Sequence, residues 1–190
     1  LTGLIKLARP KQWIKNGFVL APLIFSGLFT QTSSLVNALF ATLFFCIASS
    51  ATYIVNDYND IEVDKKHPIK SKNRPLASGE VTKKQALLFL GFLYTLLIAA
   101  FFYHPKVLSV IAVYLAINFA YTLKLKHQPV VDIFILAFGF VLRVYAGAVA
   151  LSVPLSSWMF ITTLCLALYL ASVKRQQELI NSGTKSRVVL

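Results

Sequence analysis

The sequence predicts an all-α polytopic membrane protein. Hydrophobic residues make up 57% of the 190-residue chain, and the mean hydropathy is +0.68. Only 14% of the residues are charged, well below the share in soluble domains. The apolar runs reach the roughly 17–25 residues that a helix needs to cross a bilayer. They are apolar on every side, whereas strands of a membrane barrel would alternate.

Six apolar runs are candidate membrane spans, and we expect them to form one domain over residues 1–190. The first, about 13–30, is interrupted by Lys15 and Pro22. The other five cover residues 35–55, 85–103, 107–123, 129–151 and 154–173. The two cysteines, Cys46 and Cys165, lie inside such runs, where small buried residues are the simplest interpretation.

Positive charge alternates between the loops that join these runs. The opposite loops, TQTSS, HPK and SVPLSS, carry only Lys106, and the remaining loops and both chain ends carry nearly all other Lys and Arg. Positively charged loops stay in the cytoplasm, so we expect the N-terminus and the active-site loops on the cytoplasmic side of the plasma membrane. The net charge of +12 is then explained by topology and ligand binding, and we expect no nucleic-acid partner.

The acidic residues also gather on one side, and four of the seven follow the second run in NDYNDIEVD. If the helix continues through residue 64, Asn56, Asp60 and Asp64 share one face, with Asp57 three residues before Asp60. Carboxylates this close repel one another unless a cation lies between them. Mg²⁺ takes oxygen ligands from one or two carboxylates and from substrate phosphates. We therefore predict a magnesium–diphosphate site on Asp57, Asp60 and Asp64, with Asn56 also catalytic; a solvated acidic helix end is the alternative.

The loop after these acids supplies cations for phosphate oxygens. We expect residues 56–84 to form a cytoplasmic catalytic loop in which Lys66, Lys70 and Arg74 bind substrate. Arginine suits this role because its guanidinium offers a bidentate fork to phosphate. The alternative for the lysines is that they only signal topology.

Polar residues at other cytoplasmic span ends are also predicted to bind substrate. They are Lys15 in the first run, Tyr121, Lys124, Lys126 and Asp132 around the turn between the fourth and fifth runs, and Lys174 and Arg175 at the end of the sixth. Simpler interpretations stay open. The segment around Lys15 and Trp13 is a possible interfacial anchor, and Lys174 can pair with Glu178 four residues later.

Arg143 lies in the fifth run, eleven residues beyond Asp132, which is roughly 16 Å deeper along a helix. An arginine at this depth is costly and usually faces the bundle interior or a wet cavity. Small residues nearby, such as Gly139 and Gly147, allow close helix packing. We predict that Arg143 holds an anionic group or an acidic side chain inside the cavity, the alternative being that it snorkels to the interface.

The motif NDYNDIEVD fits N-D-x-x-D-x-x-x-D and resembles the first aspartate-rich motif of the UbiA superfamily of intramembrane prenyltransferases. Longer segments are similar to the decaprenyl-phosphate phosphoribosyltransferase branch over nearly the whole chain: LARPKQWIKNGFVLAPLIFSG, YIVNDYNDIEVDKKHPIKSKNRPLASGEV, YTLKLKHQPVVDIFILAFGFVLRVYAGAVA and KRQQEL. The resemblance implies nine transmembrane helices around a cavity that opens to the cytoplasm and laterally to lipid. This chain supplies about six. Because it begins at Leu1 and ends in KSRVVL, we expect a fragment of a longer protein.

Two departures from ordinary prenyltransferases favour the phosphoribosyl branch. Tyr121 is followed by lysines at its third and fifth positions in place of Y-x-x-x-K, and the segment KRQQE lacks the second aspartate pair. The resemblance then implies Mg²⁺-dependent transfer of 5-phosphoribose from 5-phosphoribosyl 1-diphosphate to a polyprenyl phosphate such as decaprenyl phosphate. Pyrophosphate is released. In actinobacteria this reaction feeds arabinan synthesis for the cell wall.

Two other functions stay open. A prenyltransferase would place a prenyl diphosphate on the same magnesium and would need an apolar pocket for an aromatic acceptor. A transporter or lipid-binding protein without chemistry would spread its ionisable residues across the bilayer, whereas the acids here lie on one side. The sequence predicts no particular oligomeric state or lipid length.

Overall fold

The computed structural model describes residues 2–123, 125 and 128–182, and within these its secondary structure is helical, without strands. The helices are α1 (Thr2–Ala8), η1 (Pro10–Leu20), α2 (Ala21–Phe25), η2 (Leu28–Thr30), α3 (Thr32–Asn59), α4 (Ile61–Lys65), α5 (Lys70–Asn73), α6 (Pro75–Ser78), α7 (Lys83–Phe101), α8 (Pro105–Leu123), α9 (Pro129–Ala150) and α10 (Ser157–Ser182).

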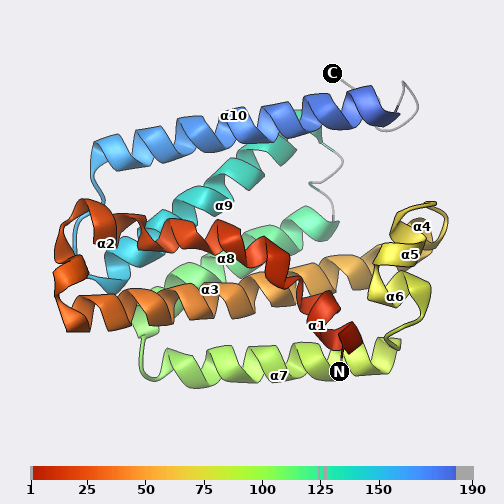
Figure 1. Ribbon diagram of the computed structural model, residues 1–190, viewed down its shortest axis with the longest axis horizontal. Coiled ribbons are helices and arrows are strands. Elements are labelled where there is room, and N and C mark those ends of the chain that lie inside the picture. The colour runs from red at the N-terminus through yellow and green to blue at the C-terminus, as the bar shows by residue number, and fades with distance from the viewer. Residues whose placement is uncertain (1, 124, 126–127, 183–190) are drawn as a thin grey trace.

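Five helices, α3, α7, α8, α9 and α10, are long and apolar enough to cross a membrane. They confirm five of the six predicted spans and the all-α class. A helix suits a bilayer because its backbone hydrogen bonds are satisfied within one segment. Successive long helices run in alternating directions (Figure 1). As a result, α1, α4–α6 and the C-terminal part of α10 lie at one end of the bundle, which we call the charged end.

The first predicted span, which the sequence showed as interrupted by Lys15 and Pro22, is not one continuous helix. It consists of the 3₁₀ helix η1 and the short helix α2, and Gly27 ends α2 with φ 70°. Pro22 at the start of α2 cannot donate a backbone hydrogen bond to the preceding turn. The segment nevertheless runs along the bundle from the charged end toward the opposite end, beside α3 and α9 (Figure 1).

The contact between η1 and α9 depends on Gly147. A Cβ atom at this position would lie only 2.0 Å from the carbonyl oxygen of Val19. Val19 itself is fully buried in a core that it shares with Phe45, Ile111 and Ala146. The absence of a side chain at Gly147 therefore lets the η1 backbone approach α9 closely.

A second core fixes the loop between α3 and α7 against the bundle. Ile61, Leu76 and Val81 from this loop pack with Leu7 of α1 and Ile54 of α3. The next helix begins sharply at Thr82, which forms a reciprocal capping box with Gln85. Burial of these apolar residues orders the loop that carries the predicted site.

Candidate active site

The aspartate-rich segment departs from the expected continuous helix. Helix α3 ends at Asn59, and Asp60 has φ −98° and ψ 8° before α4 begins. Backbone bonds from Asp60 N to Asn56 O (3.0 Å) and from Asp64 N to Asp60 O (2.8 Å) span the break. Asp57 and Asp64 are both buried, whereas Asp60 is half-buried. We call Asp57 and Asp64 the aspartate pair.

Two arginines neutralise the aspartate pair. Arg74 Nη1 donates to Asp57 Oδ1 at 2.9 Å and also to Asp64 Oδ2. Arg9 Nη2 donates to the same Asp57 Oδ1 at 2.5 Å, and its guanidinium lies 4.9 Å from the Tyr53 ring centroid. Arg9 has φ 52°, in the left-handed region that residues other than glycine and asparagine seldom adopt. Its backbone therefore takes an uncommon conformation where its side chain reaches Asp57.

The donor set fits a divalent cation shared with a substrate. Asp57 Oδ2 is buried and has no hydrogen-bond partner, which is rare for a carboxylate oxygen. Across the described part of the chain, no three acidic, histidine or cysteine side chains gather closely enough to hold a metal by themselves. Mg²⁺ commonly binds through one or two carboxylates and completes its shell with water and phosphate oxygens. The predicted use of all three aspartates as ligands stays a prediction.

Other predicted loop residues lie around the aspartate pair with fewer contacts. Lys70 Nζ is 3.9 Å from Asp64 Oδ1, and Lys66 is exposed. Asn56 is half-buried on the last turn of α3. His67 shapes the loop, because its Nδ1 accepts hydrogen bonds from the backbone N–H groups of Ile69 and Lys70.

A third buried carboxylate, that of Asp132, joins α8, α9 and α10 at the charged end. Its Oδ1 accepts a hydrogen bond from Tyr121 Oη at 2.6 Å, and its Oδ2 pairs with Arg175 Nη2. The structure thus brings together Tyr121, Asp132 and Arg175, which the sequence assigned to the cytoplasmic ends of different spans. Lys124 and Lys126, also predicted to bind substrate, lie outside the described residues.

Arg143 faces the interior as predicted, but its partners are neutral and not acidic. Nε donates to Asn16 Oδ1 (2.8 Å), Nη1 to the Gly139 carbonyl (2.7 Å) and Nη2 to Tyr114 Oη (3.2 Å). The guanidinium also lies 4.9 Å from the Tyr114 ring centroid. Of the two predicted partners, the acidic side chain is therefore wrong for the described residues, whereas an anionic group stays a prediction. The snorkelling alternative is excluded because Arg143 is only 6% exposed.

Lys15 and Lys174 are exposed side chains on η1 and α10. Their predicted role in substrate binding stays a prediction.

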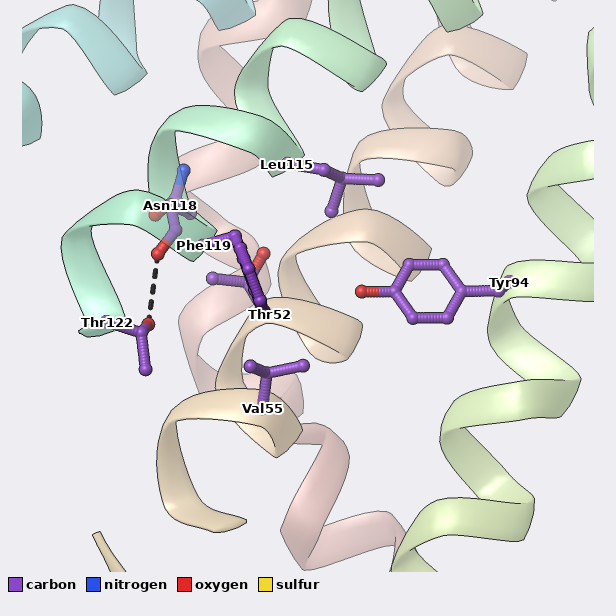
Figure 2. Close-up of a pocket in the computed structure, with 7 residues that line it drawn as sticks. All are labelled: Thr52, Val55, Tyr94, Leu115, Asn118, Phe119 and Thr122. Atoms are coloured by element: carbon purple, nitrogen blue, oxygen red, sulfur yellow. Dashed lines mark hydrogen bonds between the residues drawn. The ribbon is translucent and has the colours of Figure 1, made fainter. Parts of the chain in front are cut away.

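Two cavities lie away from the aspartate pair. Figure 2 shows a small notch between α3, α7 and α8, where Thr52, Tyr94 and Thr122 contribute hydroxyl groups. Its volume of about 10 Å³ holds at most one water molecule. A larger apolar groove of about 290 Å³ lies between α7 and α8 toward the opposite end, lined by residues such as Phe101 and Leu108.

Arg9, Asn16 and Tyr114 were missing from the residues predicted from sequence. Arg9 directly precedes Pro10 and Asn16 directly follows Lys15 in the polar segment LARPKQWIKNG, so that segment was the available signal. Tyr114 gave no sequence signal of a site residue, because a tyrosine in an apolar run is usually an ordinary core residue.

Comparison with known proteins places these features in a family. Residues 19–179 match the UbiA prenyltransferase family. Decaprenyl-phosphate phosphoribosyltransferase of Mycolicibacterium smegmatis is 40% identical over 186 residues, covering 94% of this chain and 58% of the relative. The enzyme of the same name from Corynebacterium glutamicum is 37% identical over 194 residues, with 97% and 58% coverage. The chain thus spans about three-fifths of the length of these relatives.

A solved structure shares the fold. It is a UbiA homolog from Archaeoglobus fulgidus bound to DMAPP and Mg²⁺, with a TM-score of 0.71 and 22% identity. The likeness covers 87% of this chain and 60% of that one.

Proposed function

Because the chain belongs to the UbiA prenyltransferase family, we propose that the protein transfers 5-phosphoribose from 5-phosphoribosyl 1-diphosphate to a polyprenyl phosphate such as decaprenyl phosphate. Pyrophosphate is the second product. The observation that carries the proposal is the buried aspartate pair with its two arginines and the unpartnered Asp57 Oδ2. The named relatives supply the choice of substrates.

The orientation follows from charge. The catalytic loop 56–84 and the N-terminus lie at the charged end, which we assign to the cytoplasmic side of the plasma membrane. A soluble, highly charged donor would reach the aspartates from that side. The polyprenyl acceptor would remain in the bilayer.

Asp57 and Asp64, with Asp60 beside them, would hold Mg²⁺. When bound, the ion would act as a Lewis acid that neutralises charge on the leaving diphosphate. Support for this cofactor comes from the buried unpartnered oxygen of Asp57 and from the Mg²⁺ bound by the solved homolog.

The protein's own residues bind and orient the two anionic substrates. Arg74, Arg9 and Lys70 can turn from the carboxylates toward phosphate oxygens, where arginine forms bidentate contacts. Lys66 extends this surface. Arg175 is oriented by Asp132, which also fixes the Tyr121 hydroxyl.

The reaction itself needs little from a general base. The bond between the anomeric carbon and the diphosphate oxygen breaks, and a bond forms between that carbon and an oxygen of the acceptor phosphate. The acceptor is already ionised near neutral pH, so no proton has to be removed. The chain's contribution is positioning and charge stabilisation.

The test uses membranes that carry the full-length protein, with labelled 5-phosphoribosyl 1-diphosphate, Mg²⁺ and decaprenyl phosphate. We expect label in the lipid phase, and we expect Asp60→Asn to lower its rate at least about 100-fold, the scale of one lost electrostatic contact in a transition state. Glu62→Gln is the matched control, because Glu62 is exposed and pairs with Lys65. Lipid label that is unaffected by Asp60→Asn would remove the site assignment.

The same membranes test the alternative of prenyl transfer. A folded protein that gives no labelled lipid from the phosphoribosyl donor, but joins a prenyl diphosphate to an aromatic acceptor, would replace the proposed donor. Within the described residues, the larger apolar groove lies toward the opposite end from the aspartates, so no observation favours an aromatic acceptor beside them.

A further inference from the structure

One face of α3 contacts the junction between α1 and η1 at three successive points. Ser50, Tyr53 and Asp57 share this face, because residues spaced by three and four positions lie above one another on a helix. Ser50 contacts the carbonyl oxygen of Ala8, and Tyr53 and Asp57 both contact the guanidinium of Arg9. The backbone and the side chain at this junction are therefore both held by α3.

The hydroxyl group of Ser50 ties the junction to α3. Its oxygen accepts a hydrogen bond from Trp13 Nε1 at 3.0 Å and lies 2.9 Å from the Ala8 carbonyl oxygen. It also lies 2.8 Å from the Cys46 carbonyl oxygen, so two acceptors share its single hydrogen. Carbonyls inside α3 already accept backbone hydrogen bonds, whereas Ala8 ends α1, where carbonyls lack a partner within the helix. The bond to Ala8 therefore contributes more to the structure.

The backbone of Arg9 takes a conformation that needs such support. Its φ of 52° and ψ of 59° lie in the left-handed region, which is unfavourable for a residue with a long side chain. Conformations of this kind persist where the surrounding structure determines them. Ser50 bonds to the chain on both sides of Arg9, because Ala8 directly precedes it and Trp13 follows four residues later. Since Ser50 is only 2% exposed, water competes little for these bonds.

The side chain of Arg9 is fixed in place and is still accessible from solution. Its Nη2 donates to Asp57 Oδ1 at 2.5 Å, and the guanidinium lies 4.9 Å from the Tyr53 ring centroid. The bond to Asp57 uses one of the five N–H donors of a guanidinium. The Arg9 side chain is 25% exposed, whereas that of Asp57 is 1% exposed. A phosphate group that approaches Asp57 therefore meets the guanidinium of Arg9 in a defined orientation.

We propose that Ser50 is a positioning residue for the diphosphate site: by fixing the backbone at Arg9, it presents the Arg9 guanidinium to the diphosphate beside Asp57. The proposal rests on the proposed function, in which a diphosphate binds with Mg²⁺ at the aspartate pair. Ser50 itself does not touch the substrate, because it is buried about two turns of α3 before Asp57. The role is the same whether the diphosphate carries a phosphoribosyl or a prenyl group.

The test measures binding of inorganic pyrophosphate to the full-length protein in lipid nanodiscs, with Mg²⁺ in excess. We expect Ser50→Ala to weaken this binding about 10-fold, the scale of one impaired contact to a charged group. The rise in melting temperature caused by Mg²⁺ alone should be at least as large as in the wild type, because a loosely held Arg9 competes less for Asp57. General damage to the site would reduce both responses and would contradict the proposal.

Ser49→Ala is the matched control for loss of a buried hydroxyl group. Ser49 is the neighbouring residue of α3 and is 1% exposed. It also bonds to η1, but at Asn16, whose Nδ2 donates to Ser49 Oγ at 3.1 Å, seven residues beyond Arg9. We expect Ser49→Ala to lower the melting temperature about as much as Ser50→Ala and to leave the pyrophosphate affinity unchanged. Equal losses of affinity in the two variants would overturn the specific role of Ser50.

A double-mutant cycle with Arg9→Gln shows whether Ser50 acts through Arg9. If it does, Ser50→Ala should cause no further loss of pyrophosphate affinity in the Arg9→Gln protein, because the group that it positions is already absent. Losses that simply add would show that Ser50 acts by another route and would overturn the proposal.

The outcomes distinguish failure of this role from failure of the proposed function. Folded Ser50→Ala protein that binds pyrophosphate as tightly as the wild type overturns the positioning role, even if phosphoribosyl transfer is observed. Pyrophosphate affinity that depends on Ser50, in a protein that transfers no phosphoribose, would keep the positioning role and overturn the proposed reaction.

Discussion

At the scale of single residues, Arg74 holds two carboxylates together. Asp57 and Asp64 come from opposite sides of the break at Asp60, and both are almost fully buried. Two buried negative charges are tolerated only when cations compensate them. Arg74 therefore binds the same two carboxylates that a metal–diphosphate complex would bind, and the arginine and the metal should compete for them.

We expect Arg74→Gln to destabilise the protein and to increase its response to Mg²⁺. Breaking a fully buried ion pair costs about 3–5 kcal/mol, and the cost here should be lower because the Arg74 side chain is 19% exposed. Mg²⁺ should restore part of the loss by neutralising the same oxygens. Thermal melting of the full-length protein, with and without Mg²⁺, measures both effects.

The control for this substitution is Lys72→Gln, in the same loop on an exposed side chain. It should leave the melting temperature and its response to Mg²⁺ unchanged. An equal rise in melting temperature on adding Mg²⁺ to the wild type and to Arg74→Gln would contradict competition between the arginine and the metal.

The residue scale also shows what sequence patterns can supply. The spacing in NDYNDIEVD indicated that Asp57 and Asp64 lie near each other, and the loop after it indicated Arg74 as a phosphate-binding residue. The contact between Arg9 and Asp57 could not be predicted from sequence patterns, because it depends on a backbone φ angle of 52° at Arg9. Local preference disfavours that angle, so only the packed structure specifies it.

At the scale of elements, η1 is an 11-residue 3₁₀ helix, much longer than the usual three or four residues. Lys15 and Pro22 indicated an interrupted span, but the helix type follows from contacts far away in the sequence. Asn16 binds Arg143, Trp13 Nε1 donates to Ser50 Oγ at 3.0 Å, and Val19 lies against Gly147. These contacts tie η1 to α3 and α9 along its length.

We expect Gly147→Ala to disrupt the packing of η1 on α9. The new methyl group would lie 2.0 Å from a backbone oxygen, so one of the two elements has to move. Overpacking of this kind costs about 1–3 kcal/mol and sometimes more. The melting temperature of the full-length protein measures this effect.

Gly91→Ala gives the matched control with the opposite sign. Gly91 lies inside α7, and a Cβ atom there would meet nothing within 4 Å. Alanine is favoured over glycine in a helix by up to about 1 kcal/mol, so this variant should be equally or more stable. Equal melting temperatures for Gly147→Ala and the wild type would show that η1 is not held by this approach.

At the scale of the whole molecule, the alternation of charge between loops agrees with the observed path of the chain. The cationic loop with α4–α6, the start of η1 and the C-terminal part of α10 lie at one end, and the start of α8 lies at the other (Figure 1). Lys106 is in the first turn of α8. Loop charge could predict this arrangement because it concerns only which segments share an end. The lateral order of the helices, with η1 between α3 and α9, depends on packing that the apolar runs do not encode.

The arrangement leads to a topology prediction that cysteine labelling can check. Cys46 and Cys165 are first replaced by serine in the full-length protein, which removes both cysteines of this chain. Lys72→Cys or Lys106→Cys is then introduced, each at an exposed position, and a membrane-impermeant maleimide is added. Because cationic loops remain in the cytoplasm, Lys72→Cys should react only in inverted vesicles. Lys106→Cys should react only in intact cells, and the reverse pattern would place the aspartates on the outer face, away from any cytoplasmic phosphoribosyl donor.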